Sequence, residues 1–151
     1  MNKKESAFWK KFLKETDVEK PVFGESWSFG AIPDELASLV LQGKKTATAS
    51  AKLEYEWGNE ELPKANRYYD ILLDGKENPV AILMTTKVYV TPFKDVTAEH
   101  AFKEGEGDLS LSYWREAHYR FWTELFDEVY RKTVDIENMD VVCEEFEVVY
   151  Q

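Results

Sequence analysis

The sequence predicts an α+β domain built around an antiparallel sheet, because segments with helical periodicity and segments with strand periodicity are mixed along one chain. Its 151 residues are about the length of one average domain, and a hydrophobic fraction of 44% with 15% aromatic residues is enough to form a core. The chain has no internal repeats, low-complexity stretches or interdomain linkers. We therefore expect one globular domain.

The first part of the chain predicts two helices. Apolar side chains recur at i, i+1, i+4 and i+5 within Ser6–Leu13, which is typical of an amphipathic helix with its lysines outside. Residues 24–30, GESWSFG, break this periodicity. A second helix is predicted over residues 31–43, because Pro33 suits the first turn and Gly43 suits the position just past the last turn.

A strand of small residues and a hairpin are predicted next. From Thr46 to Lys52, polar residues alternate with three alanines, which is strand periodicity with an unusually small face. Such a face leaves space for a neighbouring helix or for a ligand. The runs YYDILL (68–73) and VAILMTTKVYV (80–90), joined by DGKENP, predict a β-hairpin whose second strand is limited by Pro92.

Two capped helices and a final strand complete the chain. They are predicted at residues 95–104, 108–130 and 141–150. Asp95 or Thr97 is expected to cap the first helix, and Gly105 to end it. Asp108 or Ser110 is expected to cap the second helix.

Charge and residue usage exclude several classes of function. With 19 basic and 29 acidic side chains the formal charge is -10, which argues against a protein that coats long nucleic acid by neutralising phosphates. A short nucleic acid or a nucleoside remains compatible with a locally basic pocket. The basic N-terminal segment is interrupted by Glu5 and Glu15 and lacks a long apolar stretch, so neither a signal peptide nor a membrane span is predicted.

Cysteine and histidine usage is equally restrictive. One cysteine, Cys143, cannot form an internal disulfide, and its apolar strand predicts a buried structural thiol. Two histidines without a Cys-x-x-Cys pattern predict no zinc site. We expect a cytoplasmic protein with no membrane partner.

Five segments together resemble one family. They are WSFG at 27–30, GKKTAT at 43–48, DG at 74–75, VTAEHAFKEGEGDLSLSYWREAH at 96–118 and VVCEEFEVVY at 141–150. In this order they resemble the ASCH (activating signal cointegrator homology) domain, a PUA-like family in which GKKTAT looks like the Gly-x-Lys-x-x-Thr motif. The resemblance implies a twisted, partly closed β-barrel with flanking helices over residues 21–151, and residues 1–20 would form an N-terminal helical extension.

The resemblance also implies a function. ASCH domains have a cleft near the Gly-x-Lys-x-x-Thr segment proposed to bind RNA or a nucleoside, and a small bacterial branch consists of amidohydrolases that remove the acetyl group of acetylcytidine. Matched residue by residue, the lysine, threonine and downstream glutamate of that branch fall on Lys45, Thr48 and Glu104. Other ASCH proteins look like ribonucleases or plain RNA-binding modules, so the family alone does not fix one reaction.

The chemistry of these three residues suits amide hydrolysis, which needs a nucleophile, a base and charge stabilisation. Thr48 is the candidate nucleophile, and Lys45 is the candidate base or charge stabiliser. To act as a base, Lys45 needs a pKa well below about 10.4, which burial beside a second cation could achieve. Glu104, at a helix C-terminus, should have a raised pKa that suits a proton carrier. Residues three apart on a strand face opposite ways, so Lys45 must still belong to the turn after Gly43, or a bulge must intervene.

Five further residues are candidates for ligand binding: Trp27, Phe29, Lys44, Ser50 and Arg115. Exposed aromatics in the glycine-flanked loop could stack a base, with core packing as the equal alternative. Arg115 could reach an anion or pair with an acidic neighbour. The aromatic residues of the long helix, namely Tyr113, Trp114, Phe121 and Trp122, together with His118, have the spacing of a buried stripe.

No cofactor and no metal site are expected. Glu106 and Asp108 could join Glu104 in holding Mg²⁺ or Mn²⁺. Their spacing, however, lacks the Ca²⁺-loop pattern, and Asp108 is needed as a cap for the helix predicted at residues 108–130. RNA or a modified nucleoside is the expected partner, and DNA is not. The alternative from another class is a non-catalytic RNA-binding module in which Lys44, Lys45, Lys52 and Arg67 contact phosphates.

Overall fold

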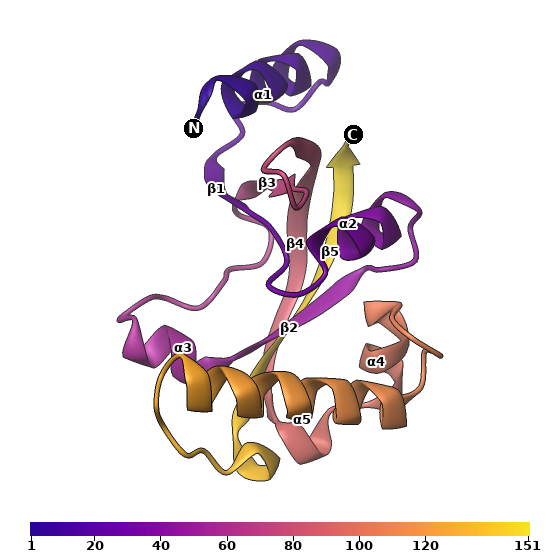
Figure 1. Cartoon of the computed structure of the whole chain (residues 1–151). Helices are drawn as coiled ribbons and strands as arrows, with labels where there is room; N and C mark the ends of the chain where they lie inside the picture. The colour runs from indigo at the N-terminus through magenta and orange to yellow at the C-terminus, as the bar shows by residue number, and fades with distance from the viewer. The chain divides into compact units, whose positions relative to one another are not determined.

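The computed structural model describes residues 1–151, and its elements fall into two compact units (Figure 1). Unit 1 consists of Met1–Thr46, Lys64–Lys87 and Phe146–Gln151. Unit 2 consists of Ala47–Pro63 and Val88–Glu145. Two long strands, β4 (Pro79–Pro92) and β5 (Asp140–Tyr150), contribute residues to both.

Unit 1 combines two helices with the hairpin. Helix α1 (Lys3–Glu15) starts at a capping box, in which Asn2 and Glu5 each accept a hydrogen bond from the other's backbone N–H. Helix α2 (Pro33–Leu41) has Pro33 in its first turn, and Gly43 follows it with a φ of +76°. Strand β3 (Tyr69–Leu73) pairs antiparallel with β4 and parallel with β1 (Phe23–Trp27).

Two apolar clusters hold unit 1 together. One joins α1 to the hairpin through Phe12, Ile71 and Ile82. The other packs α2 against the sheet and includes Phe29, Leu36, Ala37, Val40, Leu72, Ala81, Leu83 and Phe146. The amphipathic pattern of both helices is therefore explained by burial on one side of each.

Unit 2 is built on β2 (Ala47–Ala51), which pairs antiparallel with β5. Four helical elements follow in this unit: α3 (Lys52–Trp57), the 3₁₀ helix η1 (Phe93–Asp95), α4 (Ala98–Glu104) and α5 (Leu111–Glu128), with η2 (Ile136–Asn138) before β5. Thr97 caps α4, Gly105 ends it in the left-handed conformation, and Ser110 caps α5. The unit's core is aromatic and centres on Phe93, Trp114, Trp122 and Phe126.

The sheet has the strand order β1-β3-β4-β5-β2. The predicted α+β class is confirmed, whereas the partly closed barrel implied by the resemblance is not formed. The sheet is mixed because β1 is parallel to β3, and it ends at β1 and β2 without closing into a barrel. No helix of the chain has the length and apolar character that a membrane crossing requires.

Three local expectations are corrected. The predicted strand ends at Ala51, and Lys52 opens α3, because six residues from Lys52 to Trp57 form a short helix. Strand β1 overlaps residues 24–30, where no helix or strand was predicted. On α5, Trp114 and Trp122 are buried as expected, but Tyr113 (41% exposed) and Phe121 (38%) face solvent, since the helix buries only one stripe.

Candidate functional site

Glu104 is the centre of a buried polar cluster in unit 2. It is 1% exposed, although it ends a helix of only seven residues. One of its carboxylate oxygens, Oε2, lies 2.7 Å from His100 Nε2 and accepts a hydrogen bond of 2.5 Å from the indole N–H of Trp114. Burial penalises an ionised carboxylate, while these two donors stabilise it.

His118 faces the other oxygen of Glu104. Its Nε2 lies 3.7 Å from Glu104 Oε1, and its Nδ1 lies 2.9 Å from the backbone carbonyl of Trp114. A carbonyl only accepts, so Nδ1 carries a proton, and in the neutral imidazole the Nε2 lone pair points toward Glu104. The ring stacks on Trp114 with 4.2 Å between centroids, and its side chain is 17% exposed. His118 therefore connects the buried carboxylate to the surface.

The surroundings of His100 favour a proton on its Nε2 atom. It is 2% exposed, and its Nδ1 has no hydrogen-bond partner. A proton on Nδ1 would be a buried N–H without an acceptor, which costs about 1–3 kcal/mol. The tautomer that fits this environment has the proton on Nε2, which donates to Glu104. The two histidines thus have opposite tautomers and different relations to the same carboxylate.

Cys143 and Tyr89 lie in the same unit and stay protonated. Burial raises the pKa of the Cys143 thiol to about 12, and the charge of Glu104 adds to this shift. Burial also raises the pKa of Tyr89, with a further contribution from its contact with Cys143. The expectation of a buried thiol in an apolar strand is confirmed, since Cys143 is fully buried.

Lys45 is the buried cation of unit 1. It is 1% exposed, and its Nζ lies 5.3 Å from the centroid of the Phe29 ring. The backbone N–H groups of Lys44 and Lys45 both donate to the carbonyl of Leu39, so Lys45 belongs to the turn after α2 and precedes β2. This placement is the first of the two arrangements that the strand-parity argument left open, the other being a bulge. Lys44, next to it, is exposed.

Trp27 and Phe29 pack against each other in unit 1. Their rings meet edge to face with centroids 5.0 Å apart, and the Trp27 N–H donates to Asp70 Oδ2 over 3.1 Å. Phe29 is buried in the α2 cluster, whereas Trp27 is only partly buried beside it. Phe29 therefore shows the core packing that was one of the two alternatives.

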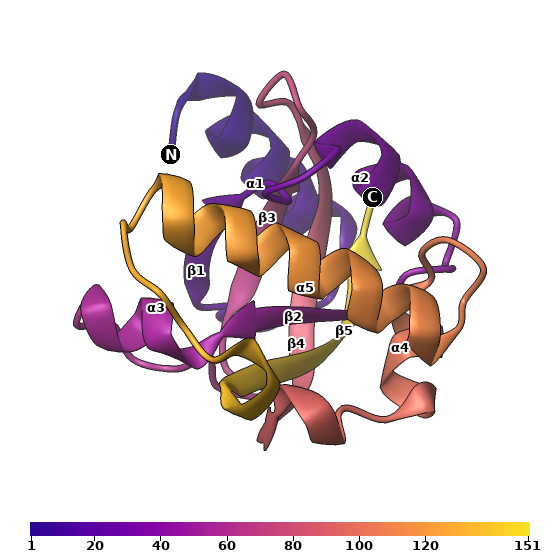
Figure 2. The same ribbon diagram turned by 60° about the horizontal axis from the view of Figure 1, so that its bottom comes forward.

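Thr48 and Ser50 share one face of β2, and the alanines share the other. Thr48 lies opposite Glu144 in β5, and Ser50 Oγ lies 3.0 Å from the hydroxyl of Tyr55. Ala49 and Ala51 pack in the cluster that contains Trp114 and Trp122 of α5. Figure 2 shows α5 crossing in front of β2. The small residues accordingly accommodate a neighbouring helix, which was one of the two explanations for them.

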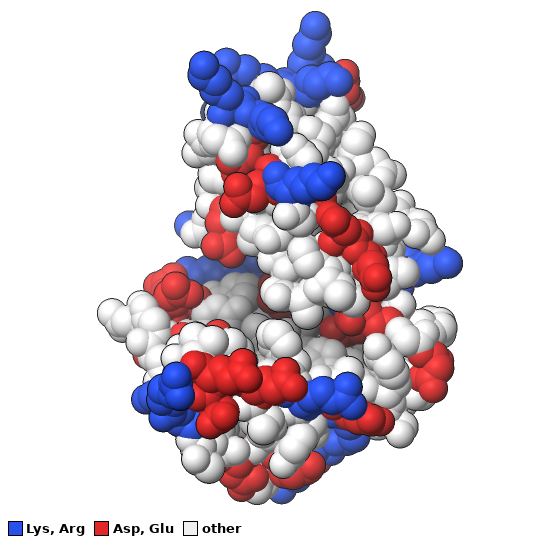
Figure 3. All heavy atoms as spheres, in the orientation of Figure 1, with Lys and Arg blue, Asp and Glu red and all other residues white.

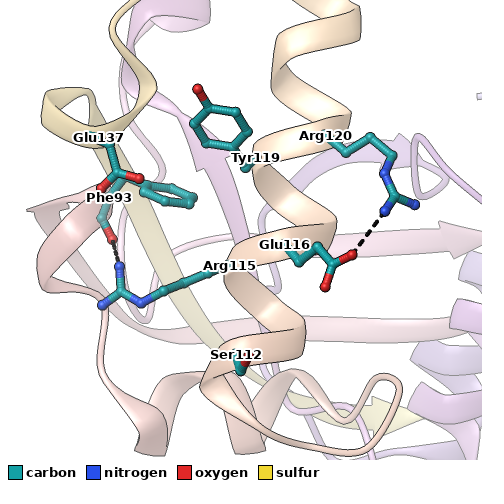
Figure 4. A pocket seen from close by; sticks show the side chains of 7 residues that line it. All are labelled: Phe93, Ser112, Arg115, Glu116, Tyr119, Arg120 and Glu137. Carbon is teal, nitrogen blue, oxygen red and sulfur yellow. Dashed lines mark hydrogen bonds and ion pairs between the residues drawn. The ribbon is translucent and has the colours of Figure 1, made fainter.

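Arg115 lines a shallow pocket on unit 2 of about 520 Å³, bounded by Phe93, Ser112, Glu116, Tyr119, Arg120 and Glu137 (Figure 4). Its guanidinium donates to the backbone carbonyls of Phe93, Lys94 and Val96 and lies over the Phe93 ring. These bonds tie η1 to α5. The side chain thus has a structural role in addition to lining the pocket.

Acidic residues do not gather into a cation site. Asp108 accepts hydrogen bonds from the backbone N–H and hydroxyl of Ser110, which lower the pKa of its carboxyl. Ser110 in turn caps α5, so Asp108 supports the cap instead of forming it. No group of three or more His, Cys, Asp or Glu side chains is arranged to hold a metal ion.

The partners of Glu104 were not predicted from the sequence. His100 and Glu104 are four apart on α4, and Trp114 and His118 are four apart on α5, so each pair shares a helix face. This spacing is a usable signal. The spacing does not predict that α4 packs on α5, and this packing is what brings the two pairs together.

Comparison with known proteins gives one family. The ASCH domain model matches residues 25–150. The structure is similar to that of an ASCH domain from Lactobacillus crispatus JV V101, with a TM-score of 0.90 and 28% identity over 100% of this chain and 97% of that chain. It is also similar to protein EF3133 from Enterococcus faecalis V583, with a TM-score of 0.83 and 37% identity over 99% of this chain and 95% of that chain. No curated protein matches the sequence.

Proposed function

The chain belongs to the ASCH domain family, whose PUA-like domains bind RNA, and from this premise we propose that it is a nucleoside- or RNA-binding hydrolase that removes the acetyl group of acetylcytidine-like nucleosides. The proposal assigns roles to Lys45, Thr48 and Glu104. The observation that carries it is the burial of Glu104 with two imidazoles and an indole around its carboxylate.

Buried ionisable groups are costly to a fold, so their presence favours a function over a purely structural role. Glu104 and Lys45 are each 1% exposed, in their respective units. Most other acidic and basic side chains of the protein lie at the surface, as is usual for charged residues. A structural carboxylate would need only donors around it, whereas Glu104 also faces the lone pair of His118.

The proposed reaction is an acyl transfer in two steps. The Thr48 hydroxyl attacks the acetyl carbonyl, its proton passes to Lys45, and the tetrahedral oxyanion collapses as the exocyclic amine of cytidine leaves with a proton from Glu104. The products of this step are cytidine and acetyl-Thr48. Water then attacks the ester and gives one proton to Glu104, while Lys45 returns its proton to the departing Thr48 oxygen. Acetic acid is released and ionises in solution, so Thr48, Lys45 and Glu104 all regain their starting states.

His118 supplies the route by which Glu104 exchanges its proton. A protonated Glu104 Oε1 and the Nε2 lone pair of His118 form a donor and acceptor separated by 3.7 Å, a gap that a small rotation closes. The partial exposure of His118 connects this pair with water. In this scheme His100 and Trp114 are positioning residues, because both bind the oxygen that does not face His118.

The experiment is to incubate the purified protein with acetylcytidine and follow loss of the acetyl group. We expect turnover by the wild type, a large loss in Lys45→Ala and Thr48→Ala, and little change in Lys76→Ala, at an exposed position outside the proposed site. Full activity in Lys45→Ala and Thr48→Ala would contradict the assigned roles.

Two other outcomes identify the alternatives. No turnover, combined with RNA binding that weakens with salt for every sequence, would indicate a non-catalytic RNA-binding module. Cleavage of RNA with or without Mn²⁺, lost in Lys45→Ala, would indicate a ribonuclease.

A further inference from the structure

We propose that one face of α1, formed by Lys3, Lys4, Lys10, Lys11 and Lys14, binds the phosphate backbone of RNA. We call it the α1 lysine face. The inference rests on the proposed RNA binding and adds a surface for it, outside the residues assigned to hydrolysis.

The lysines are gathered by helix geometry. At about 100° per residue, the five positions fall within about 120° of the helix circumference, with Ala7 between them. All five side chains are exposed. None forms an ion pair, and only Lys4 has a hydrogen-bond partner, the side-chain oxygen of Asn78 at 2.9 Å. Their charge is therefore available to a ligand.

The two acidic residues of α1 form no ion pair with these lysines. Glu5 is buried and bonds the backbone N–H of Asn2 at the start of the helix. Glu15 accepts a hydrogen bond from the Tyr150 hydroxyl. Figure 3 shows the resulting gathering of basic side chains over α1, on a chain whose formal net charge is -10.

The opposite face of α1 fixes the direction in which the lysines point. Phe12 is fully buried, and its ring packs against Tyr69 and Tyr150, while Trp9 meets Phe23 edge to face. The helix therefore cannot turn its lysines inward without losing this cluster. This rigid, outward-facing row of cations is about 16 Å long, so it can contact several successive phosphates of a polyanion.

The same packing argues for RNA over a lipid surface. A membrane-binding helix of this type needs a free apolar face, but the apolar face of α1 is occupied by unit 1, and Leu13 is its one exposed large apolar side chain. A lysine ammonium group binds phosphate as a point charge, and phosphate contacts do not distinguish one base from another. We therefore expect sequence-independent affinity from this surface.

The test compares two variants of equal charge. One carries Lys→Gln at positions 3, 10, 11 and 14, and the control carries Lys76→Gln, Lys87→Gln, Lys94→Gln and Arg131→Gln, all at exposed positions outside α1. Lysine and glutamine have similar helix propensity, so both variants should fold, as circular dichroism would verify. Binding of a short fluorescent single-stranded RNA is measured against salt concentration, alongside turnover of free acetylcytidine.

We expect the α1 variant to lose roughly two orders of magnitude in RNA affinity near 0.1 M salt, and its salt slope to fall by about 3, which is about 0.7 for each of four phosphate contacts. The control variant should keep most of its affinity, and both should turn over free acetylcytidine like the wild type. Equal losses in the two variants, or no loss in either, would overturn the inference while leaving the hydrolase proposal standing.

Two further outcomes are decisive. A wild type that binds no RNA would refute the RNA half of the proposed function and this inference with it. Binding to anionic lipid vesicles that exceeds RNA binding and disappears in the α1 variant would assign the surface to a membrane and refute RNA as its partner.

Discussion

Replacing Glu104 in two ways separates its structural role from its chemical role. Glu104→Ala leaves the N–H groups of His100 and Trp114 buried without an acceptor. Each unsatisfied donor costs about 1–3 kcal/mol, so we expect a loss of about 2–6 kcal/mol in the free energy of unfolding. That is a large share of the roughly 5–15 kcal/mol typical of a domain.

Glu104→Gln should keep the fold. Its amide oxygen can take the place of Oε2 and accept from both donors, and its NH₂ group then takes the place of Oε1 and points to the His118 lone pair. We expect the free energy of unfolding to stay within about 1 kcal/mol of the wild type. Both variants lack the carboxylate charge, so the difference between them reports the two hydrogen bonds together with the packing lost on truncation to alanine.

Urea denaturation of the wild type and both variants measures these values. Glu99→Gln, at an exposed position on the same helix, is the matched control and should be neutral. If Glu104→Ala were as stable as Glu104→Gln, the two donors would have other acceptors and the cluster as described would be wrong. If Glu104→Gln were as unstable as Glu104→Ala, the opposite tautomers assigned to the histidines would be refuted.

Three further predictions follow from buried or bonded groups. Lys45→Ala should reduce the free energy of unfolding by about 2–4 kcal/mol in thermal or urea unfolding, because it removes a buried stem and its contact with Phe29. Lys44→Ala, at the exposed neighbour, should be nearly neutral, and an unchanged stability of Lys45→Ala would contradict the burial assigned to Lys45. Native Cys143 should resist alkylation at pH 8 and react once urea unfolds the chain, since its pKa is about 12; fast labelling of the native protein would refute this. Tyr130 donates a hydrogen bond to Glu54, which raises the pKa of the Tyr130 hydroxyl to about 12. Tyr130→Phe should therefore remove about 1 kcal/mol of stability below pH 10, and this loss should vanish as the pH rises through 12. A loss that persists at higher pH would contradict the prediction.

Local signals in the sequence predicted most of the helix ends. Thr97, Ser110 and Gly105 act as predicted because caps depend on a residue's own hydrogen bonds and on its backbone conformation. Strand β1 was missed because its five residues include Gly24 and are partly exposed, so they carry no alternating apolar pattern. Helix α3 was missed because it is short and directly continues a strand.

The candidate site, like the fold, was only partly predictable from the sequence. The turn position of Lys45 was one of two alternatives that strand parity left open, the other being a bulge, and the positive φ of Gly43 fits the turn. The environment of Glu104 was not deducible, because it depends on contacts between α4 and α5 across ten residues and more. A buried carboxylate could be expected to have partners, but the sequence does not say which side chains the fold brings to it.

Turnover of acetylcytidine by the wild type and by Glu104→Gln, measured at equal concentration of folded protein, tests the central claim most directly. A proton carrier typically contributes about 10²- to 10⁴-fold to the rate, so we predict a loss of kcat/KM in that range with an intact fold. Equal kcat/KM values in the two proteins would show that Glu104 carries no proton in the reaction, and absence of turnover in both would refute the hydrolase.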